Sequence, residues 1–428
     1  MATLLHLGVG LYHLLIRAAA LFSPKAKAWV NGRKGIWERL SKKRDALQGC
    51  IWMHCASVGE FEQGLPVLEA LRRDRPEAPV LITFFSPSGY EARKGFSWAT
   101  HVDYLPADGR RNAERFLELV QPSLVLWVKY EFWPCWLMGL RSHSIPTYLI
   151  SGIFRPEQAF FRWYGAAHRS MLRCFTRIFV QDVRSRALLQ SIRIDDVTVS
   201  GDTRFDRVDA IAREGARLPI GQAFHRAMDA PVLIAGSTWP ADEAVIAEAL
   251  RTMPNAPRLT IAPHEPSPAS LRRIEQRMQR PVVRWSELEA MLHGVSAAQS
   301  HAASPDEDPL FARTLLVDRM GILARLYQHA DIAYVGGGFG DGIHSILEAA
   351  AWGKPVVFGP RHTKFAEAAG LIEAGGGFEV RNAEQLRAVL KRLLADRSAR
   401  DAAAAAALGY VRDRVGATAR ITSGIDAA

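Results

Sequence analysis

Glu60 is the residue in this sequence best placed for acid–base chemistry. It ends the tetrapeptide Ser57-Val-Gly-Glu, which follows an apolar segment predicted to be a strand and precedes apolar residues at helical spacing. A carboxylate at the end of a strand could take a proton from a substrate hydroxyl. The same S-x-x-E spacing is typical of a capping box, in which the glutamate only satisfies a backbone amide.

Neighbouring residues favour the chemical interpretation of Glu60. Gly59 allows a ligand to approach the backbone closely, and Gly64 with Pro66 makes a poor start for a regular helix. On these residues alone, the capping interpretation remains at least as well supported.

A glycine-rich block between Tyr334 and Pro360 is the second candidate site. It reads YVGGGFGDGIHSILEAAAWGKPVVFGP, with the pattern of strand, turn, helix and strand. Its glycines free the backbone to fold around a ligand, and a helix N-terminus near Ser345 would offer amides to a phosphate. Glu348 either caps this helix with Ser345 or bonds ribose hydroxyls. The block lacks the P-loop lysine and comes late in the chain, so ATP hydrolysis and dinucleotide binding are not expected.

Shorter polar motifs follow other predicted strands: Tyr130-Glu-Phe-Trp-Pro134, GDTRFDRV from Gly201, GSTWPADE from Gly236, APHEP from Ala262 and DRMGIL from Asp318. Singly, each could be an ordinary turn or helix start. His264, in APHEP, lies just past a strand, which is a typical place for a site residue. The histidines and carboxylates have no metal-ligand spacing, so we expect no metal.

The elements that position these motifs alternate short apolar strands with helical segments, which is typical of parallel sheets. Seven strands are predicted in each half, at 51–56, 80–85, 102–105, 124–128, 147–150, 178–181 and 197–200, then at 232–235, 259–262, 282–285, 314–317, 332–335, 356–358 and 377–380. We therefore expect an α/β protein with two doubly wound, Rossmann-like domains at 45–205 and 231–428, joined by a linker at 206–230. Ligands of such folds bind at the carboxyl ends of the strands, here in a cleft between the domains.

The charge of the chain is concentrated near its start. The net charge is +10, and residues 17–44 contain nine basic side chains against one acid, a local +8. This distribution argues against a nucleic-acid protein. The apolar stretch from Leu4 to Phe22 precedes the basic segment, so residues 1–44 are predicted to anchor the protein to the anionic cytoplasmic leaflet of a membrane. An ordinary buried helix is the alternative.

Taken together, these motifs resemble the Kdo transferases of Gram-negative bacteria (glycosyltransferase family 30), which have the GT-B fold and add 3-deoxy-D-manno-octulosonic acid (Kdo) to the lipid A precursor. The resemblance covers most of the chain: the anchor, SVGE, YEFWP, GDTRFD and the late glycine-rich block. Segments such as KYEFW, GIFRP and FGDGIH are similar to the branch found in Bacteroidetes-type organisms.

The resemblance implies roles for particular residues. Glu60 corresponds to the catalytic base of the family, and Ser57, Gly59 and Glu131 are candidates for the acceptor side. The family's nucleotide contacts correspond to His264, Glu265, Gly321, Ile322, Leu323, Ser345, Ile346, Leu347 and Glu348. Three of these depart from the family pattern. His264 and Glu265 occupy the R-H-P element without its arginine, Ile322 replaces a glutamate, and Ser345 replaces an asparagine.

The implied reaction is an inverting transfer from CMP-Kdo to a hydroxyl of the lipid-linked glucosamine disaccharide, with release of CMP, no metal cofactor, and a location on the cytoplasmic face of the inner membrane. Two other classes remain open. One is a different GT-B nucleotide-sugar transferase or an epimerase, and the other is a membrane-bound binding protein on an inactive glycosyltransferase fold.

Overall fold

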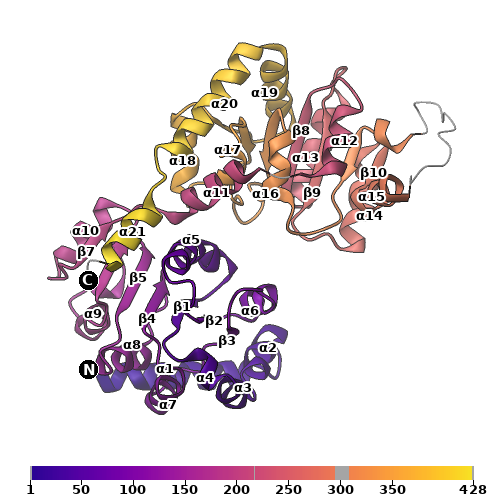
Figure 1. Ribbon diagram of the computed structural model, residues 1–428. Coiled ribbons are helices and arrows are strands. Elements are labelled where there is room, and N and C mark those ends of the chain that lie inside the picture. Colours follow the sequence, from indigo (N-terminus) through magenta and orange to yellow (C-terminus); the bar gives the residue numbers. More distant parts are fainter. Residues whose placement is uncertain (1, 216, 295–307, 427–428) are drawn as a thin grey trace. The chain divides into compact units, whose positions relative to one another are not determined.

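The computed structural model describes residues 2–215, 217–294 and 308–426, which divide into two compact units (Figure 1). The first unit contains Met1–Arg207 and Val415–Ala428, and the second contains Val208–Arg414. Each unit has one parallel sheet of seven strands with helices packed on it. The predicted α/β class and GT-B fold, with two doubly wound domains, are therefore confirmed.

The sheet of the first unit has the order β3-β2-β1-β4-β5-β6-β7, and all neighbouring strands are parallel. The strands are β1 (Ile51–Cys55), β2 (Val80–Phe84), β3 (His101–Tyr104), β4 (Leu124–Val128), β5 (Thr147–Gly152), β6 (Arg177–Val180) and β7 (Val197–Val199). Successive side chains of a strand point to opposite faces, so Trp52 and Trp127 pack in one core while Met53 and Leu126 pack in the other. Burial on both faces explains why a central strand such as β4 is a continuous apolar run.

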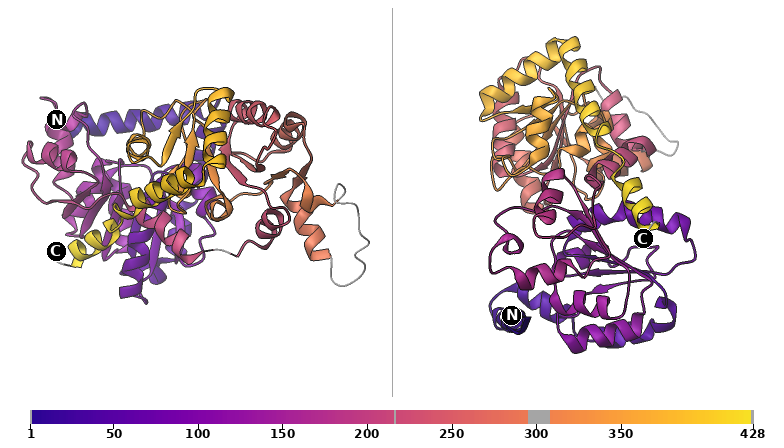
Figure 2. Two further views of the ribbon diagram at one scale, coloured as in Figure 1. Left: turned by 90° about the horizontal axis from the view of Figure 1, so that it is seen from above. Right: turned by 90° about the vertical axis from the view of Figure 1, so that its left-hand side faces the viewer.

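Helices cover both faces of this sheet (Figures 1 and 2). They are α1 (Ala2–Ala19), α2 (Pro24–Gly32), α3 (Ile36–Lys42), α4 (Arg44–Leu47), α5 (Val58–Asp74), α6 (Pro87–Arg93), α7 (Arg110–Val120), α8 (Pro134–Ser142), α9 (Ala166–Leu172), α10 (Val183–Gln190) and α21 (Ala417–Asp426). The apolar stretch predicted as an anchor forms α1. In the part of the chain that the structure describes, no helix is both long and apolar enough to cross a membrane.

The C-terminal helix α21 belongs to the first unit, although 231–428 was predicted as one domain. It packs against α5, and Ile421 and Ile425 enter the first unit's core. The carboxylate of Asp206 accepts hydrogen bonds from the amides of Gly416 and Ala417, at 2.9 and 3.1 Å. The chain therefore returns to its first unit for its last helix.

The predicted linker at 206–230 is largely helical. It contains most of α11 (Thr203–Glu214) and all of α12 (Pro219–Arg226). Ile220 and Phe224 of α12 are buried in the second unit. In α11 Phe205 and Val208 are buried, but so is the charged Asp209, so the sequence of α11 lacks the regular apolar period that identifies a helix.

The sheet of the second unit has the order β10-β11-β9-β8-β12-β13-β14 and is also parallel. Its strands are β8 (Val232–Thr238), β9 (Arg258–Pro263), β10 (Val282–Arg284), β11 (Thr314–Leu316), β12 (Ile332–Val335), β13 (Val356–Phe358) and β14 (Gly377–Glu379). The helices are α13 (Pro240–Arg251), α14 (Pro268–Met278), α15 (Trp285–Gly294), α16 (Leu323–Leu326), α17 (Leu347–Ala350), α18 (Ala366–Glu373), α19 (Ala383–Ala395) and α20 (Arg397–Arg412). All fourteen predicted strands are present, with ends shifted by a few residues.

Candidate active site

Glu60 lies in the first turn of α5, directly after β1. The hydroxyl of Ser57 caps this helix by accepting a hydrogen bond from the Glu60 amide at 3.5 Å. The Oε2 atom of Glu60 in turn accepts from the amide of Ala56 at 2.5 Å. This is a variant of the capping box, because the carboxylate reaches the residue before the N-cap. Glu60 therefore has the predicted capping role, but only one of its two carboxylate oxygens takes part in it.

The carboxyl group of Glu60 has an unusual affinity for protons. The residue is only 8% exposed. Its pKa is raised from 4.5 to about 7, chiefly because burial disfavours the charged form; the Ala56 amide lowers the pKa and nearby Glu131 raises it further. A carboxylate with a pKa near neutrality suits a general base, because a large fraction of it is ionised near pH 7 and it still holds a proton well.

Gly64 and Pro66 lie inside α5, which is a continuous helix from Val58 to Asp74. The prediction that they disturb its start is wrong. Gly64 serves packing, because a Cβ at this position would lie 2.5 Å from the sulfur of Met53 in β1. Gly59 differs, since a Cβ there would meet only the Ser57 hydroxyl, at 3.9 Å. The surface beside Glu60 is therefore open enough for a ligand to approach.

Glu131 follows β4 and belongs to a network of buried polar groups. Its Oε2 atom accepts a hydrogen bond from the indole of Trp133 at 2.7 Å and lies 3.3 Å from Nε2 of His54. The other ring nitrogen of His54 is 2.9 Å from the hydroxyl of Thr83. His54 is fully buried, so this chain of contacts holds the Glu131 carboxylate in one orientation. The structure thus brings Glu60 and Glu131, two predicted site residues, to neighbouring strand ends.

Backbone strain accompanies this site. Lys129, between β4 and Glu131, has a φ of 67°, in the left-handed region that non-glycine residues rarely adopt. The positive charge of Lys129 lowers the pKa of Glu60. Strained residues of this kind concentrate at functional sites, where the surrounding structure holds them in place.

An aromatic layer connects α1 and α2 to the same region. The ring of His13 stacks on Trp29 and on Trp133, with centroid distances of 5.7 and 6.1 Å. The guanidinium of Arg33 lies 3.8 Å from the centre of the Trp29 ring and donates to the carbonyl of Phe85 at 2.9 Å. Burial lowers the pKa of Arg33 to about 9. Arg33 is therefore an internal cation, and it does not contribute to the basic surface predicted for residues 17–44.

In the second unit, His264 lies at the carboxyl end of β9 in a stack of three rings. Its imidazole packs on Trp239, with centroids 4.8 Å apart, and on His344, with centroids 4.3 Å apart. The indole nitrogen of Trp239 donates a hydrogen bond to Nε2 of His344 at 2.9 Å. Because an indole can only donate, the neutral His344 ring carries its proton on Nδ1. Burial and the neighbouring His264 lower the pKa of His344 to about 4, so the ring is neutral near pH 7.

Asp242 fixes the loops around this stack. One of its oxygens accepts from the amides of Trp239 and Gly337, both at 2.9 Å, and the other accepts from the hydroxyl of Tyr334 at 2.8 Å. The side chain is fully buried, and its pKa is raised chiefly by that burial. Asp242 thereby ties the start of α13 to the glycine-rich turn after β12.

The glycine-rich turn owes its composition largely to packing within the protein. Gly337 has a φ of 93°, and a Cβ there would lie 2.2 Å from the carbonyl oxygen of Gly342. At Gly338 a Cβ would meet the backbone of Gly359 at 2.6 Å. Gly337 thus allows the turn to fold closely on itself, and Gly338 allows the ends of β12 and β13 to approach each other. That the turn also folds around a ligand stays a prediction.

The helix expected near Ser345 begins two residues later and has four residues, Leu347–Ala350. Its N-cap is Ile346, without a side-chain hydrogen bond, so Ser345 and Glu348 do not form the capping pair that the spacing suggested. Ile346 and Leu347 are buried and can offer a ligand only backbone groups. So short a helix also has a small dipole, which weakens the expected attraction for phosphate.

The remaining residues predicted to bind the CMP-sugar also lie at the carboxyl end of the strands in the second unit's sheet. Gly321, with a φ of 86°, precedes Ile322, which is the N-cap of α16. The side chain of Leu323 approaches Gly236, near the end of β8. Glu265 follows His264, and its carbonyl accepts from the hydroxyl of Ser270 at 2.6 Å. The structure thus gathers the predicted donor residues around the ends of β8, β9 and β12.

Sequence reasoning assigned no role to several residues that complete these sites, namely His54, Thr83, Trp239, Asp242 and His344. The first two lie inside apolar strands, where an isolated polar residue gives little signal. Trp239, Asp242 and His344 occur in the motifs GSTWPADE and FGDGIH, which mark a site without revealing which side chains meet.

Comparison with known families gives a consistent result. The family described as 3-deoxy-D-manno-octulosonic-acid transferase (kdotransferase) matches residues 32–207. A 3-deoxy-D-manno-octulosonic acid transferase of Bordetella pertussis is 28% identical, and the alignment covers 98% of this chain and 99% of the relative. The transferase of Aquifex aeolicus is 27% identical over 81% of this chain and 86% of its own length. These relatives do not test the Bacteroidetes-like branch, which stays a prediction.

Solved structures with the same fold include proteins of different activity. A UDP-GlcNAc 2-epimerase of Neisseria meningitidis has a TM-score of 0.60 at 16% identity, covering 88% of this chain and all of that one. MurG of Acinetobacter baumannii has a TM-score of 0.53 at 13% identity, covering 89% of this chain and all of that one. At such low identity the likeness concerns the fold alone.

Proposed function

We propose that the chain is a member of the 3-deoxy-D-manno-octulosonic-acid transferase family, which the family match over residues 32–207 and the relative of 28% identity support. We propose further that it transfers Kdo from CMP-Kdo to a lipid A precursor in lipopolysaccharide synthesis. The observation that carries this proposal is the buried carboxyl of Glu60, whose pKa is raised to about 7 at the end of β1. A transferase needs such a base, whereas a binding protein on the same fold does not.

Glu60 is the general base in this proposal. Its second oxygen takes the proton of an acceptor hydroxyl, while the Ala56 amide holds Oε2 in place. The hydroxyl oxygen then attacks the anomeric carbon of the donor, and the bond from that carbon to the CMP phosphate breaks with inversion. Glu131, held by Trp133 and His54, lies close enough to raise the pKa of Glu60, and we assign it to the acceptor side with Ser57 and Gly59.

The donor would bind at the second unit's ring stack. We assign His264, Glu265, Gly321, Ile322, Leu323, Ser345, Ile346, Leu347 and Glu348 to this site, and the structure adds Trp239 and His344. The Nδ1–H of a neutral His344 is a donor suited to a phosphate oxygen. Backbone amides and hydrogen bonds can stabilise a departing monophosphate, so we propose that the transfer needs no divalent metal. Activity retained in a chelator would support this.

A membrane surface is the proposed location. Leu14 and Leu15 of α1 are 62% and 58% exposed, and Phe22 just beyond the helix is 89% exposed. Lys25 and Lys27 lie close by and are exposed. Exposed apolar side chains beside cations are typical of helices that lie in the interface of an anionic leaflet. We propose that this surface holds the protein on the cytoplasmic face of the inner membrane, where a lipid acceptor is available.

The decisive experiment is product analysis by mass spectrometry with CMP-Kdo and a tetraacylated lipid A precursor. Wild-type protein should convert the precursor to a Kdo-bearing product, and Glu60→Gln should not. Glu62→Gln is the matched control, since Glu62 is on the same helix and forms surface ion pairs with Arg93 and Arg207. The control should keep its activity. Turnover of a UDP-sugar but not of CMP-Kdo would contradict the proposal and favour another GT-B enzyme.

A further inference from the structure

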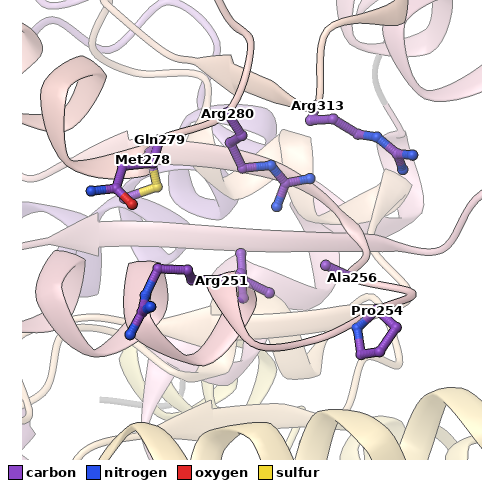
Figure 3. Close-up of a pocket in the computed structure, with 8 residues that line it drawn as sticks. Arg251, Pro254, Ala256, Met278, Gln279, Arg280 and Arg313 are labelled. Atoms are coloured by element: carbon purple, nitrogen blue, oxygen red, sulfur yellow. The ribbon is translucent and has the colours of Figure 1, made fainter.

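A cavity of about 270 Å³ opens in the second unit, and its lining includes none of the residues assigned to the sugar donor. Figure 3 shows the lining residues. Its lining comes from the segments that precede β9, β10 and β11 and comprises Leu250, Arg251, Pro254, Ala256, Met278, Gln279, Arg280 and Arg313. It therefore lies at the amino ends of these strands, whereas His264 lies at the carboxyl end of β9. Six residues of strand, or roughly 20 Å, separate the two ends.

Three arginines from separate segments contribute to this cavity (Figure 3). Among the described residues, Arg251, Arg280 and Arg313 form no ion pair. Neighbouring arginines behave differently, since Arg273 pairs with Glu243 and Arg284 pairs with Glu275. The lining itself contains no acidic residue. No carboxylate of the lining therefore neutralises the cations of this cavity.

A fourth arginine, Arg258, is the first residue of β9, and its charge interacts with the charges of Arg280 and Arg313 of the cavity. Arg258 is fully buried, and its guanidinium donates to the carbonyls of Phe224, Leu310 and Ala312 without meeting a carboxylate. Burial and the charges of Arg313 and Arg280 lower the pKa of Arg258 to about 10. Cations that repel one another in this way gain stability when an anion binds between them.

The free guanidinium donors indicate what kind of anion fits. Arg280 uses one nitrogen to donate to the carbonyl of Pro257 at 3.1 Å, and its other donors have no partner among the described residues. Arginine binds phosphate oxygens through paired N–H groups with well-defined geometry. Gln279 adds a neutral amide, and Leu250 and Met278 add an apolar wall. The cavity is large enough for a small phosphorylated molecule.

We propose that this cavity is a second anion site, distinct from the donor site, that binds a small, soluble phosphate-bearing molecule through Arg251, Arg280 and Arg313. The test uses inorganic pyrophosphate as the probe and isothermal titration calorimetry of the full chain at low salt. CMP is present in excess so that the donor site is occupied. Wild-type protein should bind pyrophosphate, and Arg251→Gln combined with Arg313→Gln should bind it at least tenfold more weakly.

The control replaces two exposed arginines of the same unit that do not line the cavity, Arg272→Gln with Arg412→Gln. It removes the same net charge and should bind like wild type. Thermal unfolding of each variant checks that it is folded. Absence of pyrophosphate binding by wild type, or an equal loss in the control, would overturn the proposal. The proposal would also be overturned if the Arg251→Gln, Arg313→Gln double variant lost binding to anionic phospholipid vesicles but kept its binding to pyrophosphate. That result would assign the two arginines to a lipid-binding surface.

Discussion

The amide of Ala56 donates to Oε2 of Glu60 at 2.5 Å, so a single carboxylate caps the helix and is also available for chemistry. The two interpretations of the S-x-x-E motif therefore do not exclude each other. In the described part of the chain no other group donates to the Glu60 carboxylate. The cap holds one oxygen in place and leaves the other without a donor among the described residues, as the proposed role of Glu60 requires of a base that must meet its substrate in one orientation.

The first prediction concerns the pH dependence of transfer. Because Glu60 acts as a base only when ionised and its pKa is raised to about 7, kcat/KM should fall as the pH drops through 7. Glu60→Gln should reduce kcat by about 100-fold or more and abolish this limb. Initial rates between pH 5.5 and 9 provide the measurement. If kcat/KM of Glu60→Gln still fell below pH 7 as in wild type, a group other than Glu60 would be responsible for the pH dependence.

The second prediction concerns stability, measured without substrate. The pKa of Glu60 is higher in the folded protein than in the unfolded chain, so the folded state binds more protons between about pH 4.5 and 7. The Glu60 contribution should therefore decrease the free energy of unfolding as pH rises through this range. Glu60→Gln removes the buried charge and should be more stable than wild type at pH 8, by at most about 3 kcal/mol.

At pH 5 the difference between the two proteins should become small, because wild-type Glu60 is then protonated. Denaturant unfolding at both pH values measures the effect, and Glu62→Gln, on the exposed side of the same helix, should show no comparable pH-dependent gain. The measured quantity is the free energy of unfolding of Glu60→Gln minus that of wild type. A smaller difference at pH 8 than at pH 5 would contradict the assigned pKa.

Much of this architecture follows from local sequence patterns. The fourteen strands could be predicted because strands buried on both faces are continuous apolar runs, and their ends indicated where Glu60 and His264 lie. The raised pKa of Glu60 could not be predicted, because it depends on burial and on Glu131, 71 residues away. The return of α21 to the first unit rests on contacts with Asp206, far away in the sequence.

The third prediction tests the ring stack of the second unit. Trp239→Phe keeps an aromatic ring next to His264 but removes the donor that fixes the His344 tautomer. Two-bond ¹H–¹⁵N spectra should show His344 protonated at Nδ1 in wild type and a mixture of tautomers in the variant. The affinity of the protein for CMP-Kdo should fall about fivefold, which corresponds to the loss of one hydrogen bond of about 1 kcal/mol.

The control for Trp239 is Trp352→Phe. The indole of Trp352 donates to the carbonyl of Ala324, outside the assigned donor residues. This variant should leave the His344 spectrum and donor affinity unchanged. An Nε2-protonated His344 in wild type would rule out the proposed role of Trp239.

The fourth prediction separates backbone strain from steric conflict in the glycine-rich turn. Gly337 and Gly375 have similar φ values, 93° and 88°, but a Cβ at Gly375 would meet no atom within 4 Å. Gly375→Ala should cost about 1 kcal/mol for the unfavourable φ alone. Gly337→Ala should cost clearly more, because its Cβ would lie 2.2 Å from the Gly342 carbonyl. Denaturant unfolding compares the two, and equal costs would mean that the turn adapts freely.

The fifth prediction concerns the apolar surface of α1. Leu14→Gln with Phe22→Gln should weaken binding to vesicles containing anionic phospholipid at least roughly tenfold, since each exposed side chain would otherwise bury apolar area in the lipid interface. Higher salt should also weaken wild-type binding, because Lys25 and Lys27 attract the anionic headgroups and salt screens that attraction. Vesicle co-sedimentation at two salt concentrations measures both effects.

The matched control replaces exposed apolar residues elsewhere, Val183→Gln in α10 and Ile372→Gln in α18. It changes as many apolar side chains without touching α1, so vesicle binding should stay at the wild-type level. The inner contacts of α1, where His13 stacks on Trp29 and Trp133, are intact in both double variants. Equal binding by the α1 variant and the control would mean that the exposed leucines and Phe22 do not contact lipid, and that residues 1–44 serve chiefly to pack against the first unit.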